Sequence, residues 1–393
     1  MKRSFLALTI ICCLASCASY DMKIAGHKSS WKTNHPTDSI SEIYHSIYLI
    51  GDVGGAKQNQ STIPLIQLKD QLATDKRDDS STDVVFLGDN IYPVGMPPLG
   101  HENRADAEHK LNVQLESVRD FGGNITFVPG NHDWYDYGRE GLRRQEKYIE
   151  DYLSQYNETF TDYFRPSDGC GNVDVMDIAK DISLVSIDSH WFLKDLENEI
   201  DFSDCDIKNR REFVSAFKDT MATLQDRKVL LSMHHPLYTT GKHGGRFKLK
   251  TILMPLTAVH KSLVIPLPVT GAVVAKMRPY VSEQDTKSKE YTNYRKYITP
   301  PVAQHGNTIV AAGHEHTLQH HEVDGIDYIV SGSGSKKNAV GMGEYTKFAY
   351  GNYGYGIIDY YNNGEIWLTF YACGEKDSSE FGTVYRTKLL TNN

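Results

Sequence analysis

The chain has 393 residues, of which 40% are hydrophobic and 23% are charged. This composition supplies enough apolar side chains for a large buried core. The formal net charge is −8 at pH 7, and an acidic balance argues against a protein that binds nucleic acid through a basic surface. We therefore expect a globular protein without nucleic acid as a binding partner.

The amino terminus has the pattern of a secretory signal peptide. A basic pair precedes the apolar stretch Phe5–Leu14, which is too short to span a bilayer. The segment Leu14–Cys17 reads LASC and resembles the lipobox of bacterial lipoproteins, in which the cysteine becomes the acylated first residue. We expect a signal peptide over residues 1–16 and lipidation of Cys17. A plain signal peptide with an incidental cysteine is the alternative.

This leader sets the expected location of the protein. Lipidation implies an exported protein that is lipid-anchored to the bacterial cell envelope. Ala18 follows the cysteine, which resembles lipoproteins sent to the outer membrane rather than those retained at the inner one. Besides the lipidated Cys17, three cysteines remain in the mature chain, and one disulfide with one free thiol fits an oxidising compartment. We predict a bond between Cys170 and Cys205, leaving Cys373 free.

Strands and helices alternate through the first half of the chain. Residues 17–43 are polar and without a period, so we predict a tether there, followed by a single catalytic domain over residues 44–393. Apolar runs predict strands that end at polar residues, and amphipathic runs between them predict helices. The predicted strands are 47–50, 84–87, 125–128, 182–187, 228–233 and 307–312; the predicted helices are 63–72, 102–118, 138–156 and 211–224.

Three further apolar segments follow near the carboxyl terminus. Ile326–Ser335, Tyr355–Tyr361 and Glu365–Ala372 alternate and are rich in aromatic and β-branched residues. We predict that they are antiparallel strands that close a second sheet. Together with the strand–helix alternation, this pattern predicts a layered α/β fold.

Polar residues with metal-binding side chains stand just past five of the predicted strands. Any one of them alone would be an ordinary turn, cap or hydrogen-bonded residue. Together they form a mixed oxygen and nitrogen ligand set suited to transition metals, and packing gives no reason for such a set at the ends of so many strands. The residues are Asp52, Asp89, Asn131, His132, His234, His314 and His316.

These residues lie in five blocks that occur in the order GDVGG, LGDNIY, GNHD, MHHP and GHEH. The blocks resemble those of the calcineurin-like metallophosphoesterases. Tyr92, three residues after Asp89, makes the chain most similar to the small, tartrate-resistant-type purple acid phosphatases. The resemblance implies a two-layer α/β sandwich of mixed β-sheets flanked by α-helices. It also implies a metal-dependent acid phosphatase that hydrolyses phosphate monoesters by attack of a metal-bound hydroxide.

The resemblance assigns the metal ligands by position. Asp52, Asp89, Tyr92 and His316 would hold Fe(III), and Asp89 would bridge to a divalent ion, either Fe, Zn or Mn. Asn131, His234 and His314 would complete that second site. The chemistry agrees, because carboxylate and phenolate oxygens suit a trivalent ion whereas imidazole and amide ligands suit a divalent one.

Further residues are assigned to the substrate side of the site. The resemblance implies that His132 hydrogen-bonds phosphate or protonates the departing alcohol, with Asp133 fixing the tautomer of its ring. It also implies that His243, nine residues after His234, lines the substrate pocket. A solvated histidine in a glycine-rich loop is the alternative for His243. We expect Asp188 to support a neighbouring loop.

An insertion over about residues 251–302 departs from the small members of the family. Its segment Thr251–Tyr280 is apolar but contains four prolines, which argues against a membrane span. We expect a hairpin or lid packed on the site. The alternative is that the segment dips into the membrane surface as a second signal beside the lipid anchor.

The expected partner is therefore a small-molecule or peptide phosphate ester. Two alternatives to an acid phosphatase stay open. One is a phosphodiesterase or general metallophosphoesterase with two divalent ions, in which Tyr92 binds no metal. The other is a surface lipoprotein that binds phosphorylated ligands without turning them over.

Overall fold

The computed structural model describes residues 18–26, 30–33, 43–74, 77–156, 162–194, 196, 200–258, 262–267, 270, 273–274, 277, 280, 282–375, 377 and 379–390. The predicted signal peptide and the lipidation site at Cys17 lie outside these residues.

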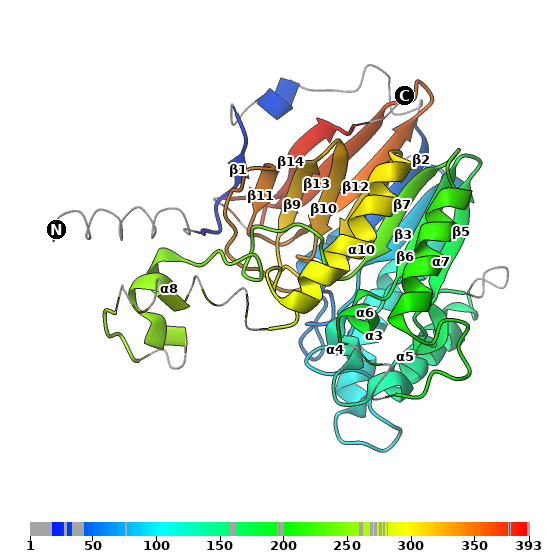
Figure 1. Ribbon diagram of the computed structural model, residues 1–393, viewed down its shortest axis with the longest axis horizontal. Helices are drawn as coiled ribbons and strands as arrows, with labels where there is room; N and C mark the ends of the chain where they lie inside the picture. Colours follow the sequence, from blue (N-terminus) through cyan, green and yellow to red (C-terminus); the bar gives the residue numbers. More distant parts are fainter. Residues whose placement is uncertain are drawn as a thin grey trace.

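Two mixed sheets form the centre of the molecule (Figure 1). The six-stranded sheet has the order β14-β13-β12-β2-β3-β4, and within it β2, β3 and β4 are parallel. Strands β12, β13 and β14 continue the sheet in antiparallel fashion from β2. The strands are β2 (Ile43–Ile50), β3 (Thr82–Phe86), β4 (Asn124–Phe127), β12 (Gly354–Tyr361), β13 (Ile366–Cys373) and β14 (Phe381–Lys388).

The eight-stranded sheet has the order β1-β11-β9-β10-β8-β7-β6-β5. Its central strands β6, β7, β8 and β10 are parallel, and the outer strands pair antiparallel. The strands are β1 (Lys23–Ile24), β5 (Val173–Ala179), β6 (Ile182–Ile187), β7 (Lys228–Met233), β8 (Thr308–Ala312), β9 (Leu318–Val323), β10 (Ile326–Ser331) and β11 (Thr346–Tyr350).

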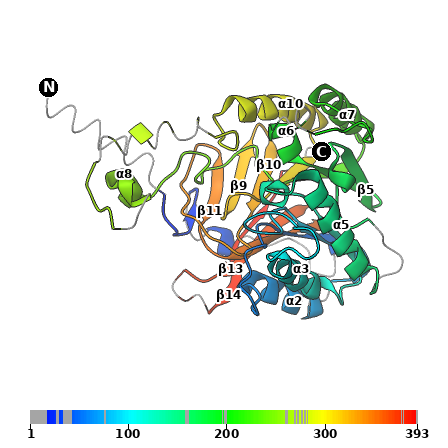
Figure 2. The same cartoon turned by 90° about the horizontal axis from the view of Figure 1, so that it is seen from below.

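Helices cover the outer face of each sheet, and Figure 2 shows the resulting four layers. One group lies on the six-stranded sheet: α2 (Ile63–Thr74), α3 (Arg104–Val118) and α5 (Gly138–Leu153); the short α4 (Asn131–Trp134) follows the carboxyl end of β4. The other lies on the eight-stranded sheet: α6 (Ser189–Lys194), α7 (Arg210–Thr223) and α10 (Lys289–His305). The short helices are η1 (Ser30–Thr33), η3 (Asp79–Ser81), η4 (Ser167–Gly169), α8 (Leu249–Leu253) and η6 (Pro255–Ala258).

Successive side chains of a strand point to opposite faces of its sheet, and both faces of each sheet are buried in the core. In β2, Ile47 and Leu49 belong to the cluster between the sheets, whereas Tyr48 and Ile50 pack with the helices. Successive side chains of a strand point to opposite faces, so a strand covered on both faces needs apolar residues throughout. The expected fold class, a two-layer sandwich of mixed sheets flanked by helices, is confirmed.

Most of the predicted helices and strands are present, but the prediction that the last three apolar segments form one sheet is wrong. The three late segments do not form one sheet: β10 pairs parallel with β8 in the eight-stranded sheet, whereas β12 and β13 join the six-stranded one. Alternation indicates a strand but carries no information about which sheet it joins. The sequence reading also missed α10, which contains Pro300 and Pro301, residues that normally break a helix.

The insertion divides into two parts. Figures 1 and 2 both show α8 beyond the β1–β11 edge of the eight-stranded sheet, away from α3 and α5. The return segment Ser282–Thr286 leads directly into α10, where the Ser288 side chain accepts a hydrogen bond from the Tyr291 N–H and caps the helix. Within the described parts of the chain, no helix has both the length and the apolarity required to cross a membrane.

Candidate active site

The site forms where the carboxyl ends of parallel strands from both sheets meet. The chain turns sharply there, and Asp52, Asp89 and His314 have positive φ angles of 58°, 55° and 66°. Non-glycine residues rarely adopt this conformation, and such strain concentrates at functional sites. Backbone hydrogen bonds hold the turns together: the Asp52 N–H donates to the Gly88 carbonyl at 2.9 Å, and the Gly54 N–H donates to the Asp89 carbonyl at 3.0 Å.

One group of predicted ligands contains the phenol. The Tyr92 hydroxyl lies 2.8 Å from Asp52 Oδ1 and 3.1 Å from His316 Nε2. His316 Nε2 is 3.4 Å from Asp52 Oδ1, and Asp89 has a carboxylate oxygen in the same cluster. All four residues assigned to the ferric site are therefore brought together.

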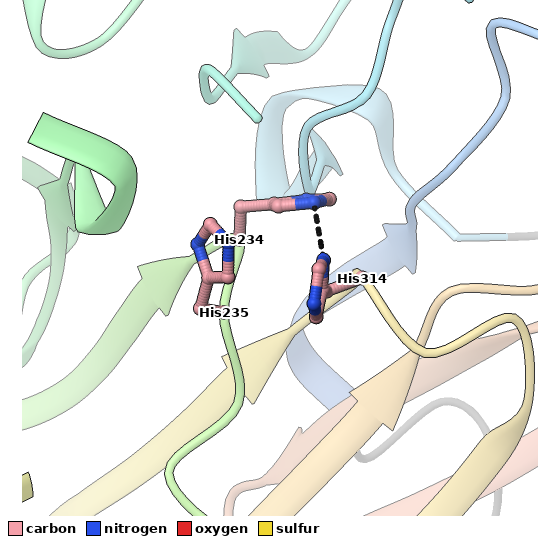
Figure 3. A group of neighbouring side chains, drawn as sticks. All are labelled: His234, His235 and His314. Carbon is pink, nitrogen blue, oxygen red and sulfur yellow. Dashed lines mark hydrogen bonds between the residues drawn. The ribbon is translucent and has the colours of Figure 1, made fainter. Parts of the chain in front are cut away.

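The second group contains the amide and two imidazoles. His234 Nε2 lies 3.1 Å from Asn131 Oδ1 and 3.3 Å from Asp89 Oδ1. His314 Nδ1 lies 3.1 Å from Asn131 Oδ1 and 3.3 Å from His234 Nε2, and Figure 3 shows this contact between the two rings. Asp89 thus touches both groups, as a bridging carboxylate must.

The donors and acceptors in the second group fit a cation at its centre. His234 Nδ1 donates to the Leu87 carbonyl at 2.8 Å, so in a neutral ring Nε2 carries a lone pair. The Asn131 amide N–H donates to the Tyr135 hydroxyl at 2.9 Å, which turns Oδ1 toward His234 and His314. Lone pairs converging at about 3 Å repel unless a positive charge lies among them, so the residues present fit a metal ion.

The electrostatics of the protein without a bound ion show which protons a cation would displace. Burial by itself lowers the pKa of His234, but the charge and hydrogen bond of Asp89, the charge of Asp52 and the hydrogen bond to the Leu87 carbonyl together raise the pKa to about 9. Burial raises the pKa of the Tyr92 phenol well above its usual value, and the Asp52 and Asp89 carboxylates raise it further. Without a cation, a proton on His234 offsets the charge of the Asp89 carboxylate and Tyr92 keeps its phenolic proton; a bound cation would displace both protons.

His235 lies beside this group without being one of the predicted ligands. One of its nitrogens is within 4.8 Å of the ligand atoms of His234 and His314, and Figure 3 shows the three rings together. Its Nδ1 contacts the Ser189 hydroxyl at 2.8 Å, and its Nε2 has no hydrogen-bond partner in the part of the chain that the structure describes. His235 therefore packs against the predicted ligands His234 and His314, and its Nδ1 is held by Ser189 of α6.

His132 lies at the edge of the cluster, where a substrate could reach it. Its backbone N–H donates to Asp89 Oδ1 at 2.9 Å, and its ring packs between Tyr92 and Tyr135. Its Nδ1 donates to the Pro93 carbonyl at 2.5 Å. The carbonyl therefore fixes the tautomer in which Nε2 accepts a proton or a hydrogen bond.

The role predicted for Asp133 is wrong. Its carboxylate does not contact the His132 ring; it accepts backbone N–H bonds from Asn90, Ile91 and Gly130 at 2.8–3.2 Å. Those N–H groups are buried and need acceptors, which explains why the side chain turns inward. Burial, with Asp89 nearby, raises the pKa of Asp133 to about 7. Asp133 supports the loop that carries Asp89 and does not orient the His132 ring.

His243 is placed at the site by a residue that sequence reasoning missed. Its ring lies 4.4 Å from that of His314, and its Nδ1 is 3.0 Å from Asp285 Oδ1. Its backbone N–H donates to Glu315 Oε1 at 2.8 Å. Asp285 is buried and comes from the return segment of the insertion, and no motif in the sequence singles it out.

Two more side chains, Gln284 and Lys336, lie at the edge of the site. The Gln284 amide donates to the Tyr135 hydroxyl, which links the return segment to the residue that orients Asn131. The Lys336 ammonium lies 2.9 Å from the ring centre of Tyr92. Lys336 forms no hydrogen bond or ion pair among the described residues, so its ammonium beside Tyr92 is available to contact an anion. Its signal in the sequence, a lysine after a glycine-serine turn, is too common to be specific.

Asp188 and the two cysteines behave as expected. The Asp188 carboxylate accepts the backbone N–H groups of His190 and Trp191 at the start of α6, and the indole N–H of Trp134 at 2.7 Å. It therefore ties α6 to α4. The disulfide between Cys170 and Cys205 is confirmed, and Cys373 is free and buried.

The comparison with protein families identifies the chain. Residues 45–260 match the calcineurin-like phosphoesterases, and the chain belongs to this family. Its members bind two metal ions and hydrolyse phosphoric esters, in agreement with the two ligand groups described above. No curated protein matches the chain.

Solved structures confirm the fold at low sequence identity. GAP50, the anchor in the inner membrane complex of Plasmodium, has a TM-score of 0.55 and 16% identity, with 89% of each chain covered. A purple acid phosphatase from yellow lupin, PPD1, has a TM-score of 0.51 and 12% identity over 88% of this chain and 54% of its own. PhoD has a TM-score of 0.51 and 9% identity over 89% of this chain and 72% of its own.

Proposed function

We propose that the protein is an acid phosphatase that hydrolyses phosphate monoesters with an iron-containing pair of metal ions. The observation that carries the proposal is the place of Tyr92, whose hydroxyl lies within 3.1 Å of both Asp52 and His316. A phenolate oxygen suits Fe(III), whereas the Asn131, His234 and His314 group suits a divalent ion such as Fe, Zn or Mn. The family itself does not require a tyrosine ligand.

The metal pair supplies Lewis-acid chemistry when bound: it polarises the phosphoryl oxygens and makes water nucleophilic near neutral pH. The chain's own residues provide the rest. His132, whose Nδ1–H donates to the Pro93 carbonyl, takes up a proton at Nε2 and donates it to the phosphate or to the departing alcohol. His243 approaches from the opposite loop in the orientation that Asp285 imposes. The Lys336 ammonium adds positive charge beside Tyr92.

The experiment is a visible absorption spectrum with metal analysis of the purified protein and of Tyr92→Phe. We expect iron and a violet band in the wild type, and loss of the band in the variant, because the band comes from a phenolate bound to ferric iron. Tyr135→Phe is the matched control: it removes another hydroxyl at the site, one that contacts Asn131, and should keep the band. A colourless, active protein with only zinc or manganese would refute the iron assignment.

Activity assays separate the remaining possibilities. We expect turnover of a nitrophenyl phosphate monoester to exceed that of the corresponding diester, and preference for the diester would favour the phosphodiesterase alternative. Binding of phosphate without turnover of either ester would favour the phospho-ligand-binding lipoprotein.

We also propose that the mature protein is exported and anchored through Cys17 to the cell envelope, at the outer membrane. The support is the LASC segment and the apolar leader before it. Mass spectrometry of the amino-terminal peptide should find acyl chains on Cys17, and a Cys17→Ser variant should lose them. An uncleaved or unmodified amino terminus in the native protein would refute the anchor.

A further inference from the structure

The first described residues, 18–20, form hydrogen bonds with residues just before the insertion. The Ala18 N–H donates to the Phe247 carbonyl at 2.9 Å, and Ser19 pairs with Val340 through two backbone hydrogen bonds. The Lys248 ammonium donates to the Tyr20 hydroxyl at 2.7 Å and lies over the ring of the same tyrosine. Any membrane attachment that precedes Ala18 therefore brings the bilayer next to residues 246–258.

The insertion exposes large apolar side chains on this side of the molecule. Figures 1 and 2 both show α8 projecting beyond the β1–β11 edge. Among its described residues, Leu263, Val264, Ile265, Val273, Val274 and Met277 are 40–59% exposed. A group of this kind on a protein in water marks an interaction site.

The charge of residues 246–281 indicates which kind of partner these exposed apolar side chains contact. Residues 246–281 contain six lysines and arginines and no aspartate or glutamate, whereas the whole chain has a net charge of −8. Exposed apolar side chains interleaved with cations match a bilayer with anionic headgroups, in which the apolar groups enter the interface and the cations pair with phosphates.

We propose that Val264, Ile265, Val273, Val274 and Met277 form a membrane-contacting surface that inserts into the headgroup region of an anionic bilayer. A single acyl chain gives only marginal, reversible attachment, and a second apolar contact makes it stable. The surface and the start of the mature chain then engage the same membrane. Gln284 and Asp285 lie in the return segment of the same insertion. Contact between this surface and the bilayer therefore also determines the orientation of the active site relative to the membrane.

The first test places an environment-sensitive dye on the full chain at Met277→Cys and adds vesicles of phosphatidylethanolamine and phosphatidylglycerol that contain brominated lipid. We expect at least fivefold quenching of the dye. The matched control is Lys147→Cys on α5, a residue with a 75% exposed side chain away from the insertion, where quenching should be absent. Equal signals at both positions, or no quenching at Met277→Cys, would overturn the proposal.

The second test measures transfer of the protein between vesicles. Val264→Asp combined with Ile265→Asp should speed transfer at least tenfold, whereas Leu99→Asp, at an 82% exposed apolar residue elsewhere, should not change it. An unchanged rate in the double variant overturns the proposal, as does crosslinking that shows the apolar leader or a second copy covering the surface. The mass of the amino-terminal peptide in the same samples shows whether Cys17 is acylated, and neither readout depends on phosphatase activity.

Discussion

Removal of the Cys170–Cys205 disulfide tests whether this bond stabilises the fold by restricting the conformations of the unfolded chain. The two cysteines are 35 residues apart, and both are buried. In the chain-entropy model, closing a loop of about 35 residues restricts the unfolded state by about 4 kcal/mol at 25 °C. With an unfolding entropy of about 2.1 cal/mol/K per residue over a domain of about 350 residues, this loss lowers the Tm by about 5 °C.

The assay is urea and thermal unfolding of the Cys170→Ala, Cys205→Ala double variant, followed by circular dichroism. Wild-type protein with a reducing agent should show a similar loss of stability, and the urea dependence should become steeper because the unfolded chain is less compact. Metal content should not change, because the hydrogen bonds of the metal-ligand residues do not involve either cysteine. An unfolding midpoint identical to that of the oxidised wild type would refute the reasoning.

Four further predictions test the site and its surroundings. Gly130→Ala should lower metal content after dialysis at least tenfold, because an added Cβ would overlap the backbone nitrogen and Oδ1 of Asp89; Gly382→Ala, with open space around it, is the control. Asp285→Asn should reduce turnover about tenfold to a hundredfold with metal content unchanged, since His243 loses its orienting carboxylate, whereas Glu283→Gln next to it should have no effect. Lys336→Met should raise the inhibition constant of inorganic phosphate about tenfold, with exposed Lys337→Met as the control; equal constants in both variants would contradict the contact. Burial raises the pKa of Glu146 to about 8, so the folded state keeps the Glu146 proton up to a higher pH than the unfolded state does. The free energy of unfolding should therefore fall as the pH rises from about 4.5 to about 8. Glu146→Gln should remove that part of the pH dependence in unfolding experiments, and an unchanged profile would show that another group causes it.

The sequence by itself determined the chemistry of the candidate metal centre. Each strand is specified by a local apolar run, and a polar residue directly after it must emerge at the end of that strand. Asp52, Asp89, His234 and His314 could therefore be placed at one edge before their neighbours were known. The cysteine count predicted one disulfide and one free thiol, whereas the pairing of Cys170 with Cys205 depends on geometry that only the tertiary structure supplies.

Only the tertiary structure decided which residues orient these groups. Asp133 is adjacent to His132 in sequence, yet its carboxylate turns to the buried N–H groups of the Asp89 loop because those donors must be satisfied. Asp285 reaches His243 from the far end of the insertion, and the sheet that β10 joins depends on its partner β8. Such contacts join segments far apart in the chain. They follow from how the layers pack, which no local pattern of residues specifies.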